Sequence, residues 1–339
     1  MLICLRFTDR LFIKNKCVRK RTLKCKFHTK LNLMLDIIGD IHGHAKELEI
    51  LLVKLGYKRN AGIYSHPEGR KCIFLGDYID RGPNIRETLH IVKDMCDTGN
   101  ALAIMGNHEF NAICFHTKHP ENGGFFRTHG LKEIEQHLDT LRQFKHFEFE
   151  WIEIFLPWFH TLPIYLELEG FRAVHACWDD NHIAWLKSNN IYSIVENKKE
   201  ISSEILTDYD NKKDKIYWVF EELLKGKEYE LLPGDEFLDK DGEIRKHARV
   251  KWFQPIEHRK YNKDVFLGLS KEKGEQLVDD STLNKLHNYS SEIPVFFGHY
   301  WLNGKPDNTN YNAICLDYSV ARNGHLVAYK FDKKEFVVV

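Results

Sequence analysis

The sequence predicts an α/β protein with two packed, mixed β-sheets and helices on the outside. One observation is an early alternation of short apolar runs and helical periodicity, at residues 35–39, 45–55, 72–75, 84–97 and 101–105. This order is typical of a parallel sheet with crossover helices. The other is a set of later, hairpin-like strands at residues 164–168, 171–174, 294–297, 313–316 and 326–331. Together they favour two sheets packed on one another.

Local signals set the bounds of the early elements. The first strand ends at Gly39, and Gly56 follows the apolar spacing of residues 45–55 as a helix stop. Asn84 is placed to cap the helix that runs to about residue 97. A turn at Glu169-Gly170 joins two strands into a hairpin.

Two longer segments interrupt this pattern, and we expect both to be helical insertions into one domain of residues 34–339. The first spans about residues 110–160, with helical periodicity from Leu131 to about Phe159, and its aromatic residues have the spacing of a buried helix face. The second spans about residues 180–260 and is highly charged. Within it, residues 239–242 resemble the start of a calcium loop, but Val250 stands where that loop needs Glu, so we predict a turn.

The formal net charge of zero conceals a basic leader. Residues 1–33 carry ten Lys or Arg and one acid, so the rest of the chain is acidic. An acidic body argues against a nucleic-acid-binding protein. The leader could be a transit peptide, a surface-binding arm or sequence upstream of a true start at Met34. We expect it to be dispensable for catalysis, which a truncation beginning at Met34 would test.

The spacing of the cysteines and the length of the apolar runs indicate the cellular compartment to expect. None of the eight cysteines forms a CxxC pair, and several lie in apolar segments where a buried free thiol is expected. This favours a reducing, cytoplasmic location. No apolar run approaches the roughly 20 residues of a membrane span, so we expect neither a membrane nor a nucleic-acid partner.

Five segments place polar residues directly after predicted strands. They are Asp40-Ile41-His42, Gly76-Asp77, Gly106-Asn107-His108-Glu109, His175 and Gly298-His299. The carboxyl ends of strands share one edge of an α/β sheet, so these side chains should meet in one crevice. Carboxylate and imidazole ligands suit Mn, Fe and Zn better than Mg or Ca. We therefore predict two divalent ions, Mn first with Fe, Zn or Ni as alternatives, and hydrolysis of a phosphate ester by a bridging hydroxide.

The motifs from Gly39 to Glu109 resemble the signature of calcineurin-like metallophosphoesterases. More narrowly, they are similar to the phosphoprotein phosphatase branch and its bacterial relatives, which include symmetrical diadenosine tetraphosphatases. The resemblance implies a four-layer α/β/β/α sandwich. It also implies metal ligands, namely Asp40 and His42 on the first ion, Asp77 bridging, and Asn107, His175 and His299 on the second. His108 would be the general acid oriented by Asp80, while Arg81 and Asn107 would hold phosphate oxygens.

This chain departs from the wider pattern at two places. Many relatives carry a second His two residues after the one in Gly298-His299, where Trp301 stands here, as in the phosphoprotein phosphatase branch. The run His175-Ala-Cys-Trp178 replaces the usual His-Gly-Gly, so we expect Trp178 to line or crowd the substrate pocket. Arg249 is the candidate for a second phosphate-binding arginine, with a solvated charge as the alternative. Cys177 is expected to be a structural thiol.

Several functions remain open at this point. The leading interpretation is a phosphatase acting on phosphoproteins or small phosphomonoesters. Symmetrical hydrolysis of a dinucleoside tetraphosphate is the alternative, with a second nucleotide pocket built by residues 110–160. A rival of another class is a catalytically silent scaffold that binds phosphate.

Overall fold

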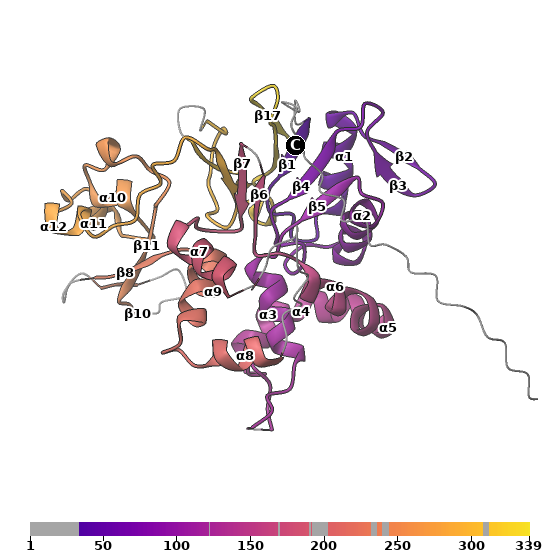
Figure 1. Cartoon of the computed structure of the whole chain (residues 1–339), viewed down its shortest axis with the longest axis horizontal. Helices are drawn as coiled ribbons and strands as arrows, with labels where there is room; N and C mark the ends of the chain where they lie inside the picture. Colours follow the sequence, from indigo (N-terminus) through magenta and orange to yellow (C-terminus); the bar gives the residue numbers. More distant parts are fainter. Residues whose placement is uncertain are drawn as a thin grey trace, which may run out of the picture. The chain divides into compact units, whose positions relative to one another are not determined.

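Two β-sheets lie face to face in the computed structural model of this chain (Figure 1). The structure describes residues 34–121, 123–168, 170–189, 191, 203–231, 236–238, 244–307 and 312–339. The larger sheet has the order β15-β16-β1-β4-β5, with β17 on β16, and the smaller has the order β14-β13-β7-β6. Residues 1–33, for which a dispensable leader is predicted, lie outside the described part.

The larger sheet contains the three strands predicted at the start of the domain. β1 (Leu35–Ile38), β4 (Lys71–Phe74) and β5 (Ala101–Ala103) are parallel neighbours. β16 (His325–Lys330) runs antiparallel to β1 and forms a hairpin with β17 (Glu335–Val338), while β15 (Asp317–Tyr318) pairs with the other end of β16. The carboxyl ends of β1, β4 and β5 therefore share one edge.

The smaller sheet is built from later strands. β6 (Tyr165–Leu168) and β7 (Phe171–Val174) form the predicted antiparallel hairpin. β13 (Val295–Phe297) and β14 (Ala313–Cys315) also belong to it, but β13 is parallel to both β7 and β14. The hairpin-like pairing expected for residues 294–297 and 313–316 is thus wrong, because these two strands run parallel. Parallel pairing brings the ends of β7 and β13 together.

The two sheets are held together by a shared apolar layer. Phe296 of the smaller sheet contacts Tyr329 of the larger, with ring centroids 5.1 Å apart, and Phe171 contacts Phe331 at 5.7 Å. Ile37, Ile73 and Ala173 belong to the same buried cluster. This layer confirms the predicted fold class of two packed, mixed sheets.

Helices cover the outer face of the larger sheet. α1 (Ala45–Leu55) packs against β16 and β17, and α2 (Ile85–Asp97) packs against β5. Gly56 ends α1 in the left-handed conformation, as predicted. Asn84 occupies the N-cap position of α2, but its side chain makes no capping hydrogen bond. Beside them, β2 (Lys58–Asn60) and β3 (Ile63–Ser65) form a small hairpin.

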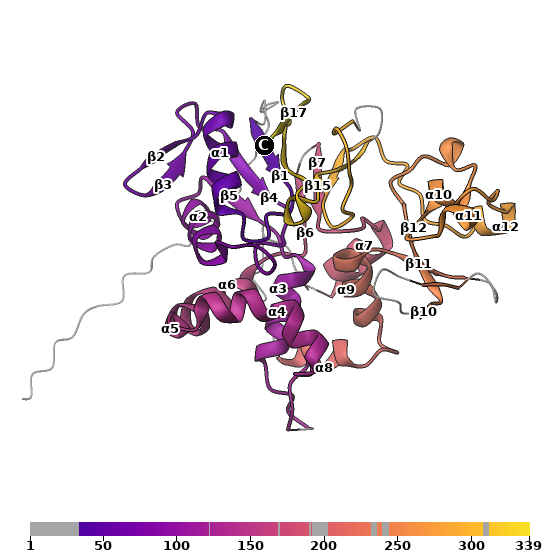
Figure 2. The same cartoon turned by 180° about the vertical axis from the view of Figure 1, so that it is seen from behind.

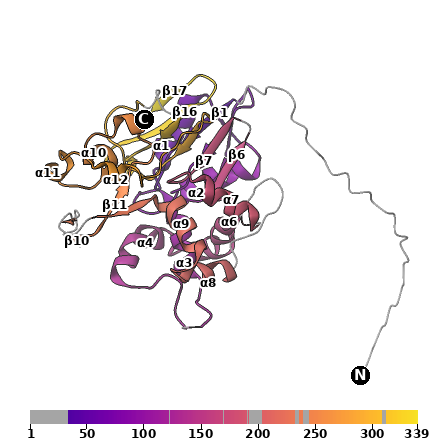
Figure 3. The same cartoon turned by 60° about the vertical axis from the view of Figure 1, so that its left-hand side comes forward.

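The segment after β5 is helical, as expected. It comprises α3 (Asn107–His116), α4 (Leu131–Phe144), α5 (Glu148–Glu150), a π-helical turn (Trp151–Phe155) and α6 (Leu156–Thr161). Trp151, Phe155 and Phe159 are buried in the core, as their spacing predicts. Figures 1 and 3 show α3, α4 and α8 grouped on the same side of the sheets.

The segment of residues 180–260 is helical only in its first half. α7 (Asp180–Ser188), α8 (Ser203–Asp210) and α9 (Lys215–Lys225) precede a run of short strands, so the prediction of helix beyond Lys225 is wrong. The strands are β8 (Glu228–Glu230), β9 (Phe237–Leu238), β10 (Ile244–Arg245) and β11 (His247–Val250). Alternating burial along β11 explains why helical periodicity fails there. Residues 239–243, with the predicted turn, lie outside the described residues.

A small substructure follows β11. It contains α10 (Asn262–Val265), β12 (Phe266–Leu267), α11 (Lys271–Gly274) and α12 (Asp280–Leu283), and β12 pairs with β11 (Figure 2). Just before it, Trp252 and Phe253 pack on Phe297, covering the outer face of the smaller sheet.

Two sequence expectations concern thiols and membrane spans. Cys72, Cys96, Cys114, Cys177 and Cys315 are free thiols, and all but Cys96 are fully buried. Burial raises the pKa of the Cys177 thiol well above its usual value, which fits the structural role expected of it. Within the described ranges, no helix combines the length and apolar character that crossing a bilayer requires.

Candidate functional site

Asp77 lies at the centre of a buried polar cluster at the carboxyl ends of both sheets. Its Oδ2 is 3.4 Å from His42 Nε2, and its Oδ1 is 3.3 Å from His175 Nε2. Asp77 belongs to two groups of potential metal ligands, one with His42 and His108 and the other with His175 and His299. We call the whole set the Asp77 cluster: Asp40, His42, Asp77, Asn107, His108, His175 and His299.

The turn after each strand fixes these side chains. The Ile41 and His42 amides both donate to the carbonyl of Asp77, at 3.1 and 2.8 Å, which ties the β1 turn to the β4 turn. At Gly106 an added Cβ would lie 2.3 Å from Asp77 Oδ1, so only glycine allows this approach. The sequence pattern of glycine before each polar residue thus has a direct steric reason.

The smaller sheet completes the cluster from the other side. Asn107 Oδ1 is 3.0 Å from His175 Nε2 and 2.7 Å from His299 Nδ1. His175 Nδ1 donates to the carbonyl of Leu75 at 2.7 Å, so its Nε2 faces the cluster. An amide oxygen and an imidazole lone pair in such proximity repel one another unless a proton or a cation lies between them.

Asp40 lies beside the same groups with an unsatisfied oxygen. Its Oδ2 accepts from the His299 amide at 3.0 Å, while its buried Oδ1 has no hydrogen-bond partner. Burial, followed by the charge of Asp317, raises its pKa well above the usual value. His299 Nε2 is likewise buried and unpartnered. These orphaned acceptors fit a site that receives divalent cations.

Imidazoles and carboxylates in the Asp77 cluster shift one another's pKa values. Burial raises the pKa of Asp77, but His175 and His108 outweigh it and bring the pKa well below its usual range. Burial lowers the pKa of His175, yet Asp77 raises it to about 10. Burial, assisted by Arg81, lowers the pKa of His42. Neutral His42 has its Nδ1 donating to the carbonyl of Ile79 at 2.9 Å, so its Nε2 faces inward as a ligand would.

The predicted general acid and its partner are in contact. His108 Nδ1 lies 2.5 Å from Asp80 Oδ2. Burial raises the pKa of Asp80, but hydrogen bonds from His108 and His137 lower it below its usual range. The opposite nitrogen, His108 Nε2, is 3.1 Å from Arg81 Nη2, and Arg81 Nη1 is 2.9 Å from His42 Nε2. The structure thus brings together the three residues for which catalytic roles were predicted.

Arg249 reaches the edge of this site from β11. Its guanidinium lies 5.9 Å from the ring of Tyr300, the residue after His299, and its buried Nε has no hydrogen-bond partner. After burial, the charge of Arg249 is the largest influence lowering the pKa of His299. Arg249 as a whole is half-buried, with its Nε on the buried side.

Backbone strain gathers at the cluster. Ten described residues other than glycine have positive φ, and six of them belong to this site: His42, Asp77, Asp80, Arg81, His299 and Trp301. Such conformations cost on the order of 1–3 kcal/mol each and persist where surrounding structure enforces them. Their concentration here indicates a preorganised functional site.

Sequence reasoning assigned no role to several residues that hold the site. Glu109 accepts from the amides of Asp77, Tyr78 and Gly106, at 2.8, 2.8 and 3.0 Å, and so anchors two of the turns. Its place in the motif after His108 was the available signal. His137 and Thr140 contact Asp80, and helical periodicity gave no indication of this.

Trp301 carries a second feature that the sequence did not reveal. Its ring lies under two guanidinium groups, with the Arg81 Cζ 4.4 Å and the Arg322 Cζ 3.6 Å from the ring centroid. Its amide donates to Asp317 Oδ2 at 2.7 Å. Trp178, by contrast, is fully buried and stacks with Arg172, so the expectation that it lines the substrate pocket is wrong.

A second group of histidine and carboxylates lies elsewhere. Asp179, His182 and Glu222 also have ligand atoms within 4.8 Å of one another. Here Lys227 Nζ lies 3.2 Å from both carboxylates, and His182 Nε2 is 2.8 Å from Glu222 Oε2. A lysine thus supplies the cation, and we call these four residues the Lys227 cluster.

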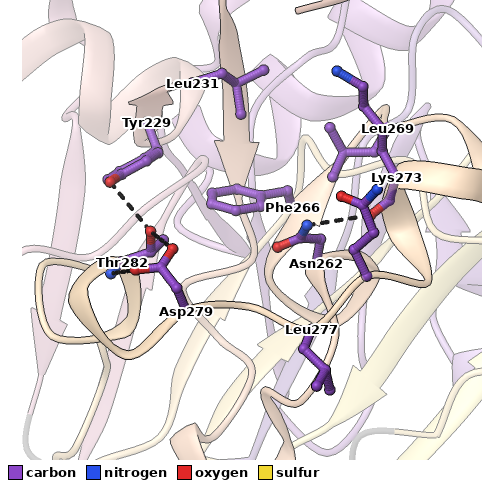
Figure 4. A pocket seen from close by; sticks show the side chains of 10 residues that line it. Tyr229, Leu231, Asn262, Phe266, Leu269, Lys273, Leu277, Asp279 and Thr282 are labelled. Carbon is purple, nitrogen blue, oxygen red and sulfur yellow. Dashed lines mark hydrogen bonds between the residues drawn. The ribbon is translucent and has the colours of Figure 1, made fainter. Parts of the chain in front are cut away.

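The described cavities are separate from both clusters. A cavity of about 150 Å³ lies between β8, β12 and the helices after them (Figure 4). Its polar side chains bond one another: Asp279 accepts from Thr282, and Asn262 donates to the carbonyl of Lys273 at 3.2 Å. A wider one of about 550 Å³ is lined by residues such as Phe253 and Tyr289. Neither is lined by a residue of the Asp77 cluster.

The class of protein is established by comparison with family models. Residues 34–300 match the calcineurin-like phosphoesterase model, which is most of the chain. The chain therefore belongs to the calcineurin-like phosphoesterase family, as the motifs suggested. Groups of potential divalent-metal ligands in the Asp77 cluster agree with this class.

Individual relatives match only part of the chain. It is 31% identical over 144 residues to the bis(5'-nucleosyl)-tetraphosphatase PrpE [asymmetrical] of Oceanobacillus iheyensis, and 34% identical over 144 residues to the protein of that name from a Geobacillus species. Each match covers 42% of this chain, and 55% or 56% of the relative. The chain thus spans just over half the length of these relatives.

A solved serine/threonine phosphatase from Saccharomyces cerevisiae also resembles the chain. It aligns over 92% of this chain and 80% of its own, with 15% identity and a TM-score of 0.41. The family assignment rests on the family model alone.

Proposed function

We propose that this chain hydrolyses phosphate monoesters, on small molecules or on proteins, with two divalent metal ions. The observation that carries the proposal is the shared Asp77 carboxylate, with His42 on one oxygen and His175 on the other. A carboxylate between two imidazole-bearing groups is suited to bridge a pair of ions. Bound ions would polarise the phosphate and lower the pKa of a bound water.

The donor types support a division of ligands between two positions. Asp40, His42 and Asp77 would hold the first ion, and Asp77 with Asn107, His175 and His299 the second. Imidazole with carboxylate favours Mn²⁺, with Fe, Zn or Ni as alternatives. The unpartnered oxygen of Asp40 and unpartnered nitrogen of His299 support this assignment.

The residues around the ligands have chemically distinct roles in the proposal. Arg81 presents a planar fork of donors that suits phosphate oxygens, and its guanidinium is 3.1 Å from His108 Nε2. In this structure His108 Nε2 accepts from Arg81, while Asp80 holds Nδ1. When Arg81 turns to the phosphate, His108 protonated at Nε2 would donate that proton to the leaving oxygen. Asn107 and Arg249 would contact further phosphate oxygens. A loose phosphoryl-transfer transition state mainly requires such positioning and positive charge.

A dinucleoside tetraphosphate is a second candidate substrate. The relatives from Oceanobacillus and Geobacillus carry that activity in their names. Trp301 also holds a second guanidinium, that of Arg322, close to Arg81, and this added positive charge would suit a longer phosphate chain. Replacing Arg322 by Gln would then weaken hydrolysis of the tetraphosphate and leave small monoesters unaffected.

A substrate panel tests both candidates. Metal-stripped protein is given Mn²⁺ and then p-nitrophenyl phosphate, a phosphopeptide or diadenosine tetraphosphate. We expect Mn-dependent release of phosphate from the first two. Turnover of the tetraphosphate to ADP alone would indicate symmetrical cleavage, and ATP with AMP would indicate asymmetrical cleavage. No turnover of any substrate, with tight binding of phosphate, would replace the proposal with the silent scaffold.

A further inference from the structure

Asp80 connects the candidate acid to the inserted helix α4. One carboxylate oxygen, Oδ2, contacts His108 Nδ1. The other, Oδ1, accepts from His137 Nδ1 at 2.8 Å and from the Thr140 hydroxyl at 2.6 Å. The Asp80 amide donates to the same hydroxyl at 3.1 Å. All four side chains are buried.

The two contacts from α4 come from one face of one helix. His137 and Thr140 are three residues apart, a spacing that places side chains side by side. They fix both the free oxygen of the carboxylate and the backbone of Asp80, which has a left-handed φ of 66°. Without them the carboxylate could rotate about its Cβ–Cγ bond and the turn could relax.

The ring of His137 is itself held on its far side. His137 Nε2 lies 3.3 Å from His116 Nε2, and the indole N–H of Trp151 donates to that same His116 nitrogen at 3.1 Å. His137 donates to Asp80 from Nδ1 and contacts His116 through Nε2, so its ring is held at both nitrogens.

We propose that His137 and Thr140 are positioning residues for protonation of the leaving group. They act through Asp80 on His108, so the inference rests on the proposed function of His108 as the acid. In this account α4 contributes to proton transfer by positioning Asp80, in addition to covering the site. The alternative is that these hydrogen bonds only attach α4 to the core.

The dependence on leaving group separates positioning from attachment. An alkyl phosphate expels a poor leaving group that needs a proton, whereas p-nitrophenolate leaves without one. For His137→Ala we expect kcat to fall about 10- to 100-fold on an alkyl phosphate and less than about 3-fold on p-nitrophenyl phosphate, with KM little changed. Equal losses on both substrates, or none, would overturn the inference.

Thr140 provides a second test that does not alter a ring. Thr140→Val removes the hydroxyl at nearly constant volume, while Thr140→Ser keeps it. We expect Val to reproduce the selective loss on the alkyl phosphate, and Ser to restore activity to within about 2-fold of the original chain. If Ser and Val behave alike, the hydroxyl has no positioning role. Glu135→Gln, on an exposed part of α4, is the matched control and should leave both substrates unaffected.

The variant His108→Asn distinguishes failure of the inference from failure of the proposed function. If it shows no preference for the better leaving group, the acid assignment itself is wrong. If it does, then His137→Ala should add little further loss in the His108→Asn background, because both act through the same proton. Multiplicative losses in the double variant would contradict the positioning role and leave the proposed function standing.

Discussion

The Asp77 cluster and the Lys227 cluster both combine histidine with carboxylates but differ in what neutralises those carboxylates. In the Lys227 cluster, the ammonium group of Lys227 lies between Asp179 and Glu222. In the Asp77 cluster the imidazoles converge on Asp77, and Asp40 keeps an oxygen with no partner. The carboxylates of the Lys227 cluster are therefore already paired with a side-chain cation, whereas Asp40 of the Asp77 cluster is not.

This difference shows why proximity of ligand-type residues does not by itself define a metal site. Both groups have potential ligand atoms within 4.8 Å. Each cluster has a buried imidazole nitrogen without a partner, His299 Nε2 in one and His182 Nδ1 in the other. The Asp77 cluster differs in the unpartnered carboxylate oxygen of Asp40 and in the strained backbone of His42, Asp77 and His299. Unsatisfied buried groups and strain destabilise a protein, and they persist where function requires them.

The two clusters should differ most when one carboxylate in each is neutralised. Asp77→Asn removes the proposed bridging charge, so kcat/KM for p-nitrophenyl phosphate should fall on the order of 10³-fold or more. Asp179→Asn should change it by less than about 3-fold once corrected for folded protein. Steady-state kinetics with saturating Mn²⁺ measures both. Comparable losses of kcat/KM in the two variants would show that the Asp77 cluster is no more important for catalysis than the Lys227 cluster.

Lys227→Met tests the opposite property, namely stability. The substitution leaves Asp179 and Glu222 without their cation, and unpaired buried charge is strongly unfavourable. Because the lysine is 28% exposed, we expect a moderate loss of about 1–3 kcal/mol in the free energy of unfolding. Urea denaturation at neutral pH measures it. A variant as stable as the original chain would show that Lys227 is not what balances this cluster.

The pH dependence of stability also tests the balance of charge in the Lys227 cluster. Asp179, Glu222, Lys227 and His287 surround His182, and burial lowers its pKa to about 4. As pH falls from about 6.5 to 4, the unfolded chain takes up a proton at this side chain before the folded chain does, so stability is lost in that window. Burial raises the pKa of Asp179, but Lys227 leads the charges that lower it to about 2, so its own contribution is lost below about pH 4.

The matched variant for this titration is His182→Gln. We expect the original chain to lose about 1–2 kcal/mol more than the variant between pH 7 and pH 4.5. Urea unfolding at a series of pH values supplies the comparison. Parallel curves for the two proteins would mean that His182 does not titrate as its surroundings indicate.

How well the sequence predicted a residue of this site depends on where that residue lies relative to the strands. Asp40, Asp77 and Asn107 come directly after parallel strands, and glycine-containing turns mark them. His175 and His299 follow strands of the second sheet and were selected for that reason, while the family resemblance supplied their ligand roles. Residues on other elements, such as Arg249, could be suggested only by analogy.

Contacts made across the fold were not predictable in this way. His137 and Thr140 have the periodicity of any amphipathic helix, and only the packing of α4 against the β4 turn brings them to Asp80. Trp178 was expected at the pocket because of its place near His175, but side-chain orientation buried it against Arg172. The late strands were recognised as strands, whereas their parallel pairing depends on the connection between them.

The most direct test of the central claim is the metal content of the protein. Chelator-treated chain is equilibrated with Mn²⁺, freed of unbound ions and analysed by elemental analysis, alongside Asp77→Asn and Asp179→Asn. We predict about two ions per chain for the original protein and for Asp179→Asn, and fewer than about one for Asp77→Asn. Retention of two ions by Asp77→Asn, or their loss from Asp179→Asn, would contradict the assignment of the Asp77 cluster as the metal centre.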